Sequence, residues 1–435
     1  MPQDRFTWNI KTLVESYEKA GHANRAWDEP AKRALTEFAR ARSRVTETNE
    51  PWGQIIATNC DLAVEAGCND PMIAYLHTRF SLDQTNSSKV FADAFCKAAQ
   101  EMQQSSYPSI RKFYATLRAA EQLKFVAGTN TPTEVHHFRH LAATQLAVFI
   151  ADRSTPVGEV DDACQDMFKL VERNNRQFEE FYRSIEKPLF QNWPKESVSW
   201  LLKGQFYIKY AWAARGGGYA NTVSQEGWRL FSERLAAAET ALAQAWELNP
   251  KDPRTAVKMM WVELGQGRGR SRMELWFRRA MELDPNSYDA CNTKLLYLEP
   301  KWHGSIEEML KFGRECVESK EWSGHVPLVL ADAHDEVPLY YLEKSDQATY
   351  WKRPEVWLDI KAAFEKFFWL NPNKPGWHHN YARYAYWCEQ WDELNQQLLQ
   401  LGPVNYDYFG GKEEFDKMVL LAKQHAAPDA IGDNK

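Results

Sequence analysis

The sequence lacks the local signals of β-structure. It contains no Asn-Gly or Asp-Gly dipeptide, the strongest short-range signal of a β-hairpin, and no sustained alternation of apolar and polar residues. Helical periodicity runs through most of the chain instead, as at 88–104 and 107–127. Prolines stand at or near the breaks between such patterns, where they punctuate helices: Pro108, Pro132, Pro156, Pro188 and Pro194. We therefore predict an all-α fold.

The chain also lacks a cysteine framework and a membrane-spanning run. Its seven cysteines are odd in number and scattered, and no Cys-x-x-Cys occurs, which argues against a disulfide scaffold or a zinc knuckle. No apolar stretch approaches membrane length, and residues 1–8 contain no core of a signal peptide. We expect a cytoplasmic protein without a membrane partner. A chain whose signal peptide had been removed would look the same, so that alternative stays open.

Motifs of catalysis are missing as well. There is no phosphate-binding loop, nucleophile elbow or kinase signature, so we expect no catalytic residue and no cofactor. Weak metal candidates are His136 and His140, one helical turn apart, and His303 and His334, which would converge with Asp332 if the segment around them folded back. Surface or hydrogen-bonded histidines and helix-capping acids explain the same residues, and we expect no metal.

The net charge of −6 argues against a nucleic-acid partner. One local exception is a group of five arginines within twelve residues, in which Arg272 and Arg279 are seven apart and share a helix face. This group would bind a phosphate or an acidic peptide, or else form ion pairs on a solvated face with Glu263, Glu274 and Glu282. Composition favours the second interpretation, and the first stays open.

What the sequence does contain is a recurring six-residue motif, called the recurring phrase below. It reads Ala-Trp-Glu-Leu-Asn-Pro at 245–250, Ala-Met-Glu-Leu-Asp-Pro at 280–285 and Phe-Phe-Trp-Leu-Asn-Pro at 367–372. The first two prolines are 285 − 250 = 35 residues apart. In each copy the leucine is predicted to be the last core residue of a helix, which the following proline cannot continue. The leucines are Leu248, Leu283 and Leu370.

This spacing and register resemble the tetratricopeptide repeat, with 253–286 as the clearest unit. The resemblance implies antiparallel helix pairs stacked into a right-handed, solenoid-like array. We predict degenerate helical hairpins over 1–190, a repeat region over 195–425 with an insertion near 299–350, and a disordered tail over 426–435. A narrower resemblance, to an uncharacterised family of bacterial repeat-containing proteins, rests on 214–220, 265–270, 274–280 and 298–305 and implies a shared fold without an activity.

Helical repeats build long grooves, so the resemblance implies a scaffold that binds a peptide or partner protein on a concave surface. We predict that the first helices of the repeats supply the contacts. The candidate residues are Lys258, Glu263, Asn292, Lys294, Tyr381 and Arg383, with Arg272 and Arg279 for an acidic ligand. The alternative is an enzyme or metal-binding protein that uses the His/Asp-rich segment 299–350.

Overall fold

In the computed structural model, the described residues (2–20, 24–45, 51–82, 87–128 and 133–425) form α-helices and no strand. The chain divides into two compact units, Met1–Leu248 and Asn249–Lys435. This division falls inside the region that the sequence predicts as one repeat array beginning at 195. The predicted tail 426–435 lies outside the described residues.

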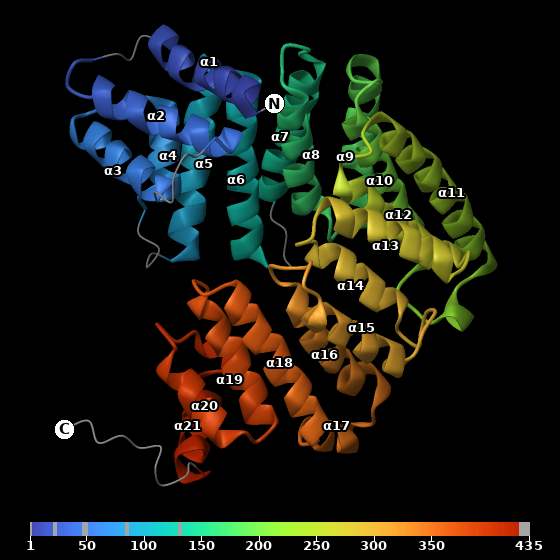
Figure 1. The fold of residues 1–435 in the computed structure, drawn as a ribbon. Coiled ribbons are helices and arrows are strands. Elements are labelled where there is room, and N and C mark those ends of the chain that lie inside the picture. The colour runs from blue at the N-terminus through green and yellow to red at the C-terminus, as the bar shows by residue number, and fades with distance from the viewer. Residues whose placement is uncertain (1, 21–23, 46–50, 83–86, 129–132, 426–435) are drawn as a thin grey trace, which may run out of the picture. The chain divides into compact units, whose positions relative to one another are not determined.

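The first unit consists of successive helices that pack against their chain neighbours, and Figure 1 shows α2 to α6 running side by side. Its helices are α1 (Pro2–Ala20), α2 (Asp28–Ser43), α3 (Trp52–Glu65), α4 (Pro71–Phe80), α5 (Ser88–Gln104), α6 (Ser109–Ala127), α7 (Thr133–Ala151), α8 (Val157–Val171), α9 (Asn175–Asn192), α10 (Ser197–Arg215) and α11 (Gln225–Leu248), with a 3₁₀ turn at Ala220–Thr222.

The second unit is a stack of helix pairs in which α12, α14 and α16 also pack on one another across the pairs. Its helices are α12 (Pro253–Gln266), α13 (Arg270–Leu283), α14 (Tyr288–Tyr297), α15 (Ile306–Glu318), α16 (Val329–Tyr341), α17 (Lys344–Trp351), α18 (Pro354–Leu370), α19 (His378–Trp387), α20 (Trp391–Leu399) and α21 (Lys412–His425). Short 3₁₀ turns lie at Val326–Leu328, Pro375–Trp377 and Tyr406–Phe409.

Both units are all-α, as the sequence predicts. The helix pairs of the second unit form a tetratricopeptide-like, solenoid-like stack. In the described residues, no helix combines the length and the apolar character that crossing a membrane requires.

The recurring phrase ends three helices where the sequence predicts. Helices α11, α13 and α18 end at Leu248, Leu283 and Leu370, directly before an Asn-Pro or Asp-Pro step. Asp284 has φ −142° and ψ 91°, an extended conformation that a following proline favours, and Asn371 also leaves the helical region, with φ −133° and ψ 64°. The prediction that these leucines are core residues is wrong for Leu248 and Leu283, which are 40% and 37% exposed, whereas Leu370 is partly buried.

Two glycines show how closely paired helices approach. A Cβ at Gly204 of α10 would lie 2.5 Å from Leu242 of α11, and a Cβ at Gly313 of α15 would lie 2.8 Å from the Cα of Leu330 in α16. Glycine is therefore required at both contacts, since no side chain fits. The second contact lies inside 299–350: α15 and α16 of this segment pack on α14 and α18, so the segment continues the stack.

Candidate protein-interaction surface

Helix α16 carries three carboxylates on one face. Asp332, Asp335 and Glu336 follow the i, i+3, i+4 spacing and are half-buried. Tyr288 of α14 donates a hydrogen bond to Asp332, and Tyr384 of α19 donates one to Asp335 over 2.6 Å. We call Asp332, Asp335 and Glu336 the acidic face. The acidic face is flanked by α14, from the preceding helix pair, and by α19, from the following one.

The acidic face holds its carboxylates in a medium that disfavours their charge. Burial raises the pKa of Asp332 to about 7, although the hydrogen bond from Tyr288 opposes this effect. Burial also raises the pKa of Asp335 and of Glu336. A raised carboxyl pKa means that the ionised form lacks sufficient positive compensation. A cationic group placed on this face would supply that compensation.

Charges and open hydrogen-bonding positions around the face are consistent with such a group. Glu299, which is 3% exposed, adds a fourth carboxylate, whereas the nearby cations are Lys301 and Arg383. Carboxylates therefore outnumber the lysine and arginine side chains around the face. Three buried polar atoms have no hydrogen-bond partner: Glu336 Oε2, Asn292 Oδ1 and Arg383 Nε. Unpaired atoms of this kind are costly unless a ligand completes them.

Two of the predicted contact residues lie on α14 and α19, which flank the acidic face, and a third lies on α12. Asn292 of α14 lies beside Tyr288, and Arg383 of α19 lies near Asp335. Lys258 lies on the neighbouring helix α12, where burial lowers the pKa of its ammonium group and Asp289 opposes that change.

Three other predicted residues serve the packing of the second unit instead. Glu263 is 1% exposed and forms an ion pair with Arg272 over 2.7 Å. Lys294 is 7% exposed, with its Nζ 2.8 Å from Glu274 and 4.3 Å from the centre of the Phe277 ring. Neither Glu263 nor Lys294 is placed to bind a partner.

Tyr381 is also a core residue. It is 3% exposed, and its ring stacks on Phe364 at 4.7 Å between centroids and on Trp357 at 5.8 Å. Its hydroxyl oxygen is buried without a hydrogen-bond partner. The aromatic residues of this repeat therefore fill the space between helices rather than line a groove.

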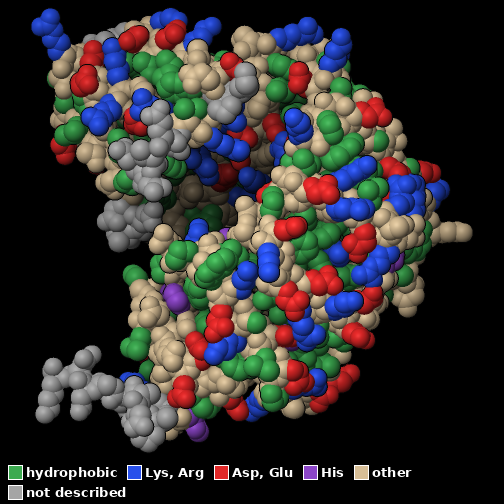
Figure 2. Space-filling view, viewed as in Figure 1, with side chains coloured by type: hydrophobic (Ala, Val, Ile, Leu, Met, Phe, Trp, Pro, Cys, Tyr) green, Lys and Arg blue, Asp and Glu red, His purple; other side chains and the backbone are tan. Residues whose placement is uncertain are grey.

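The arginine group forms ion pairs on a mixed surface. Arg272 pairs with Glu263, Arg270 pairs with Glu274 and Glu308, and Arg279 lies 4.5 Å from the centre of the Trp276 ring. On the face shown in Figure 2, basic and acidic side chains are interspersed over the region of α13 to α15.

A cavity of about 670 Å³ next to this group has a lining unsuited to an anion. It is lined by Glu274, Glu282 and Glu321 but by a single arginine, Arg278.

The four histidines weighed as metal ligands lie apart or are engaged. His136 and His140 are exposed on α7. His303 Nε2 lies 2.9 Å from the carbonyl oxygen of Leu264, and buried His334 lies 2.7 Å from the Tyr350 hydroxyl and 3.0 Å from Asp359. Asp332 points to Tyr288 instead, so these residues do not converge. Within the described ranges, no three His, Cys, Asp or Glu side chains are grouped to hold a metal ion.

Sequence reasoning missed the two tyrosines that flank the acidic face. Tyr288 and Tyr384 lie 44 and 49 residues from the carboxylates they contact, and no local pattern pairs them. The only available signal is register: each tyrosine lies on the first helix of a pair, as do Asn292 and Arg383.

Comparisons with known proteins add little to this surface. No family model and no curated protein matches the chain. One solved structure that it resembles is a chain of the crystal structure of the APC/C hetero-tetramer Cut9-Hcn1, with 11% identity and a TM-score of 0.25, covering 98% of this chain and 82% of that one. A likeness at this level carries no function across, and the description of the fold rests on the helix packing within each unit.

Proposed function

We propose that this protein is an interaction scaffold and that the acidic face of its second unit binds an extended segment of a partner protein through a lysine or arginine side chain. The observation that carries the proposal is the group of three half-buried carboxylates on one face of α16, contacted by Tyr288 and Tyr384, and their raised pKa values agree with it. The ammonium or guanidinium group of the partner would pair with these carboxylates.

Side chains around the face suit a peptide backbone as well as a cation. Asn292 Oδ1 and Glu336 Oε2 are buried acceptors without a partner among the described residues, and a rotation of either side chain towards the bound segment would let it accept from an amide or ammonium donor. Leu339 and Tyr340, which follow Glu336 on α16, are 64% and 56% exposed and would contact apolar parts of the bound segment. Arg383 would take a backbone carbonyl or an acidic side chain.

The test is selection of random peptides displayed on phage against the full-length chain, followed by affinity measurement of the enriched peptides. We expect enrichment of peptides that contain Lys or Arg, and weaker binding to Glu336→Gln and Asp332→Asn variants. Each lost ion pair should reduce affinity about tenfold, because hydrogen bonds to charged groups contribute about 1.5–3 kcal/mol.

Glu318→Gln is the matched control, because Glu318 is an exposed acid at the end of α15, outside the acidic face. The proposal fails if the enriched peptides lack basic residues, or if they bind the two acidic-face variants as tightly as the native chain and the control. Cytoplasmic location and the resemblance to a bacterial repeat family remain parts of the proposal, and neither changes this experiment.

A further inference from the structure

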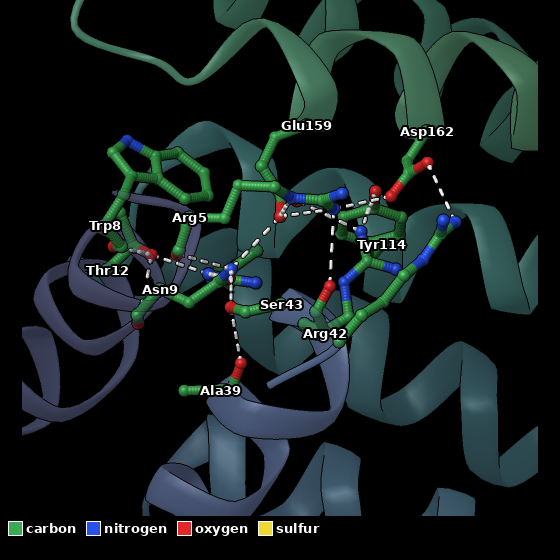
Figure 3. A network of polar contacts seen from close by, with 12 residues as sticks. Arg5, Trp8, Asn9, Thr12, Ala39, Arg42, Ser43, Tyr114, Glu159 and Asp162 are labelled. Carbon is green, nitrogen blue, oxygen red and sulfur yellow. Dashed lines mark hydrogen bonds and ion pairs between the residues drawn. The ribbon is translucent and has the colours of Figure 1, made fainter. Parts of the chain in front are cut away.

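The first unit buries a network of charged side chains drawn from α1, α2, α6 and α8 (Figure 3). Glu159, on the first turn of α8, is fully buried and accepts hydrogen bonds from Arg5 over 2.7 and 2.9 Å, from Asn9 over 3.1 Å and from Arg42 over 3.2 Å. Arg5 also donates to Asp162 over 2.5 Å. The network fixes α1 and α2 against the beginning of α8.

Cations outnumber anions in this network. Arg111 is 1% exposed and contacts no carboxylate: it donates to Asn9 over 2.5 Å and to Thr12 over 2.6 Å. Burial lowers its pKa to about 10. Together Arg5, Arg42 and Arg111 face the two carboxylates of Glu159 and Asp162. The surroundings of α8 therefore carry an excess of positive charge that an added anion would compensate.

A cavity of about 820 Å³ adjoins the network. Its walls are α1, the end of α2 and the turn that enters α8, and its charged lining residues are Arg5, Lys11, Arg44 and Asp4. Arg44 lies 3.7 Å from Asp162, whereas exposed Lys11 has no ion pair in the described part of the chain. Three cations against one acid make the lining basic.

The amino end of α8 opens into the same cavity. The helix starts at Val157 after Pro156, and no side chain caps it. Val157 and Gly158 line the cavity, and the amides of a first helical turn have no acceptor within the helix. The positive end of the 15-residue helix dipole adds to the charge of the lysine and arginines.

Thr155 gives an independent indication of a ligand. It lines the cavity and is 4% exposed, and its Oγ1 is buried without a hydrogen-bond partner. A buried hydroxyl is normally paired. An anion oxygen in the cavity would accept this hydroxyl proton, and no group in the described part of the chain does so.

We propose that this cavity binds a phosphate group, as free phosphate or as a small phosphate monoester. The Thr155 hydroxyl and the first amides of α8 donate to its oxygens, and Lys11 and Arg44 neutralise its charge. Arg5 is held by Glu159 and Asp162 and forms a fixed basic wall. Trp8, Pro156 and Val157 line the same cavity and provide apolar surface for the organic part of an ester.

Isothermal titration calorimetry of the full-length chain tests the site, with inorganic phosphate and phenyl phosphate as ligands at matched ionic strength. We expect saturable binding that weakens about tenfold in Thr155→Val, the loss expected for one hydrogen bond to a charged group, and that weakens in Lys11→Met. Tighter binding of phenyl phosphate would support an ester, and equal binding would support free phosphate. Either outcome supports the site.

Two controls separate this role from a structural one. Thr155→Val removes no protein hydrogen bond, so its thermal midpoint should equal or exceed that of the native chain. Lys19 lies on α1, as does Lys11, but it is exposed and outside the cavity, so the Lys19→Met variant should bind phosphate as the native chain does. The proposal is overturned if the native chain shows no saturable binding, or if Thr155→Val and Lys11→Met bind as tightly as Lys19→Met.

Discussion

Replacing Glu159 with glutamine tests whether the buried network holds the first unit together. The substitution keeps the shape of the side chain but removes its charge, and it places an amide group against guanidinium donors. Arg5 would keep Asp162 at 2.5 Å, whereas Arg42 would keep the hydroxyl of Tyr114 and already has a buried Nε without a partner. The variant thus leaves Arg42 and Arg111 as buried cations with little compensation.

The expected cost follows from that difference between the arginines. Breaking a buried ion pair by removal of one partner costs about 3–5 kcal/mol. Because Arg5 retains a carboxylate, we expect the lower end, about 3 kcal/mol, which corresponds to about a hundredfold change in an opening equilibrium.

Acid should weaken the network in the same way. Burial alone would raise the pKa of Glu159, but Arg42, Arg5 and Arg111 outweigh it and lower the pKa below the usual 4.5 of a glutamate. The stabilisation is therefore present above pH 4.5 and is lost as the pH falls through the lower, folded-state pKa.

Hydrogen exchange followed by mass spectrometry suits this measurement, since a chain with two compact units has no single unfolding transition. Peptides from α2, α6 and α8 should exchange about a hundredfold faster in the variant, while peptides from α12 to α16 should not change. Glu180→Gln is the control: its pair with Arg176 is exposed, with side chains 52% and 88% accessible, and should contribute at most about 0.5 kcal/mol. If Glu159→Gln changes exchange no more than this control, the network is not stabilising and the reasoning is refuted.

Three further substitutions test other parts of the structure. Gly204→Ala should destabilise the first unit by about 1–3 kcal/mol, because its Cβ would meet Leu242, whereas Gly53→Ala, with open space around it, should not; equal denaturation midpoints would contradict the packing. Asp332→Asn should stabilise the second unit by about 1–2 kcal/mol at pH 8 and not at pH 4. The reason is that a carboxyl group with a raised pKa makes the folded state lose stability as the pH rises towards 7. A gain in thermal stability that is independent of pH would refute this. His334→Ala should lower the free energy of unfolding by about 2–4 kcal/mol, because it leaves a cavity and removes two hydrogen bonds. It should not change the amount of zinc that the chain retains after gel filtration, and loss of bound zinc in the variant would instead favour the metal-binding alternative.

Helix boundaries were predictable where the chemistry of one or two residues decides them. A proline two residues after Leu248, Leu283 and Leu370 marks the end of each helix, because proline cannot donate the hydrogen bond that would continue it. Proline alone does not decide a boundary, since Pro188 and Pro338 lie inside α9 and α16. Helical periodicity over 159–183 runs across a break between two helices, because the chain turns after α8 and Asn174 caps α9 through its side chain. Nothing in the periodicity marks that break, since apolar residues continue in register on both sides.

Side-chain environments were less predictable. Trp369 lies in the recurring segment 367–372, two residues after fully buried Phe367, yet it is 74% exposed. The network around Glu159 joins residues up to 157 apart, and each of its members is an ordinary polar or charged residue in the sequence. Only the fold brings them together, so spacing along the chain could not reveal either the network or the cavity beside it.

The Asn-Pro and Asp-Pro junctions have a consequence for the thermodynamics of binding. Proline fixes its own φ and restricts the residue before it, so these turns sample few conformations even before the unit folds. In the second unit, Pro285 stiffens the connection between α13 and α14, which contains no glycine, and Pro372 and Pro375 stiffen the connection between α18 and α19. A surface held by stiff connections is pre-organised, and association then loses little conformational entropy of the protein. The ordering cost of complex formation would accordingly fall on the partner segment.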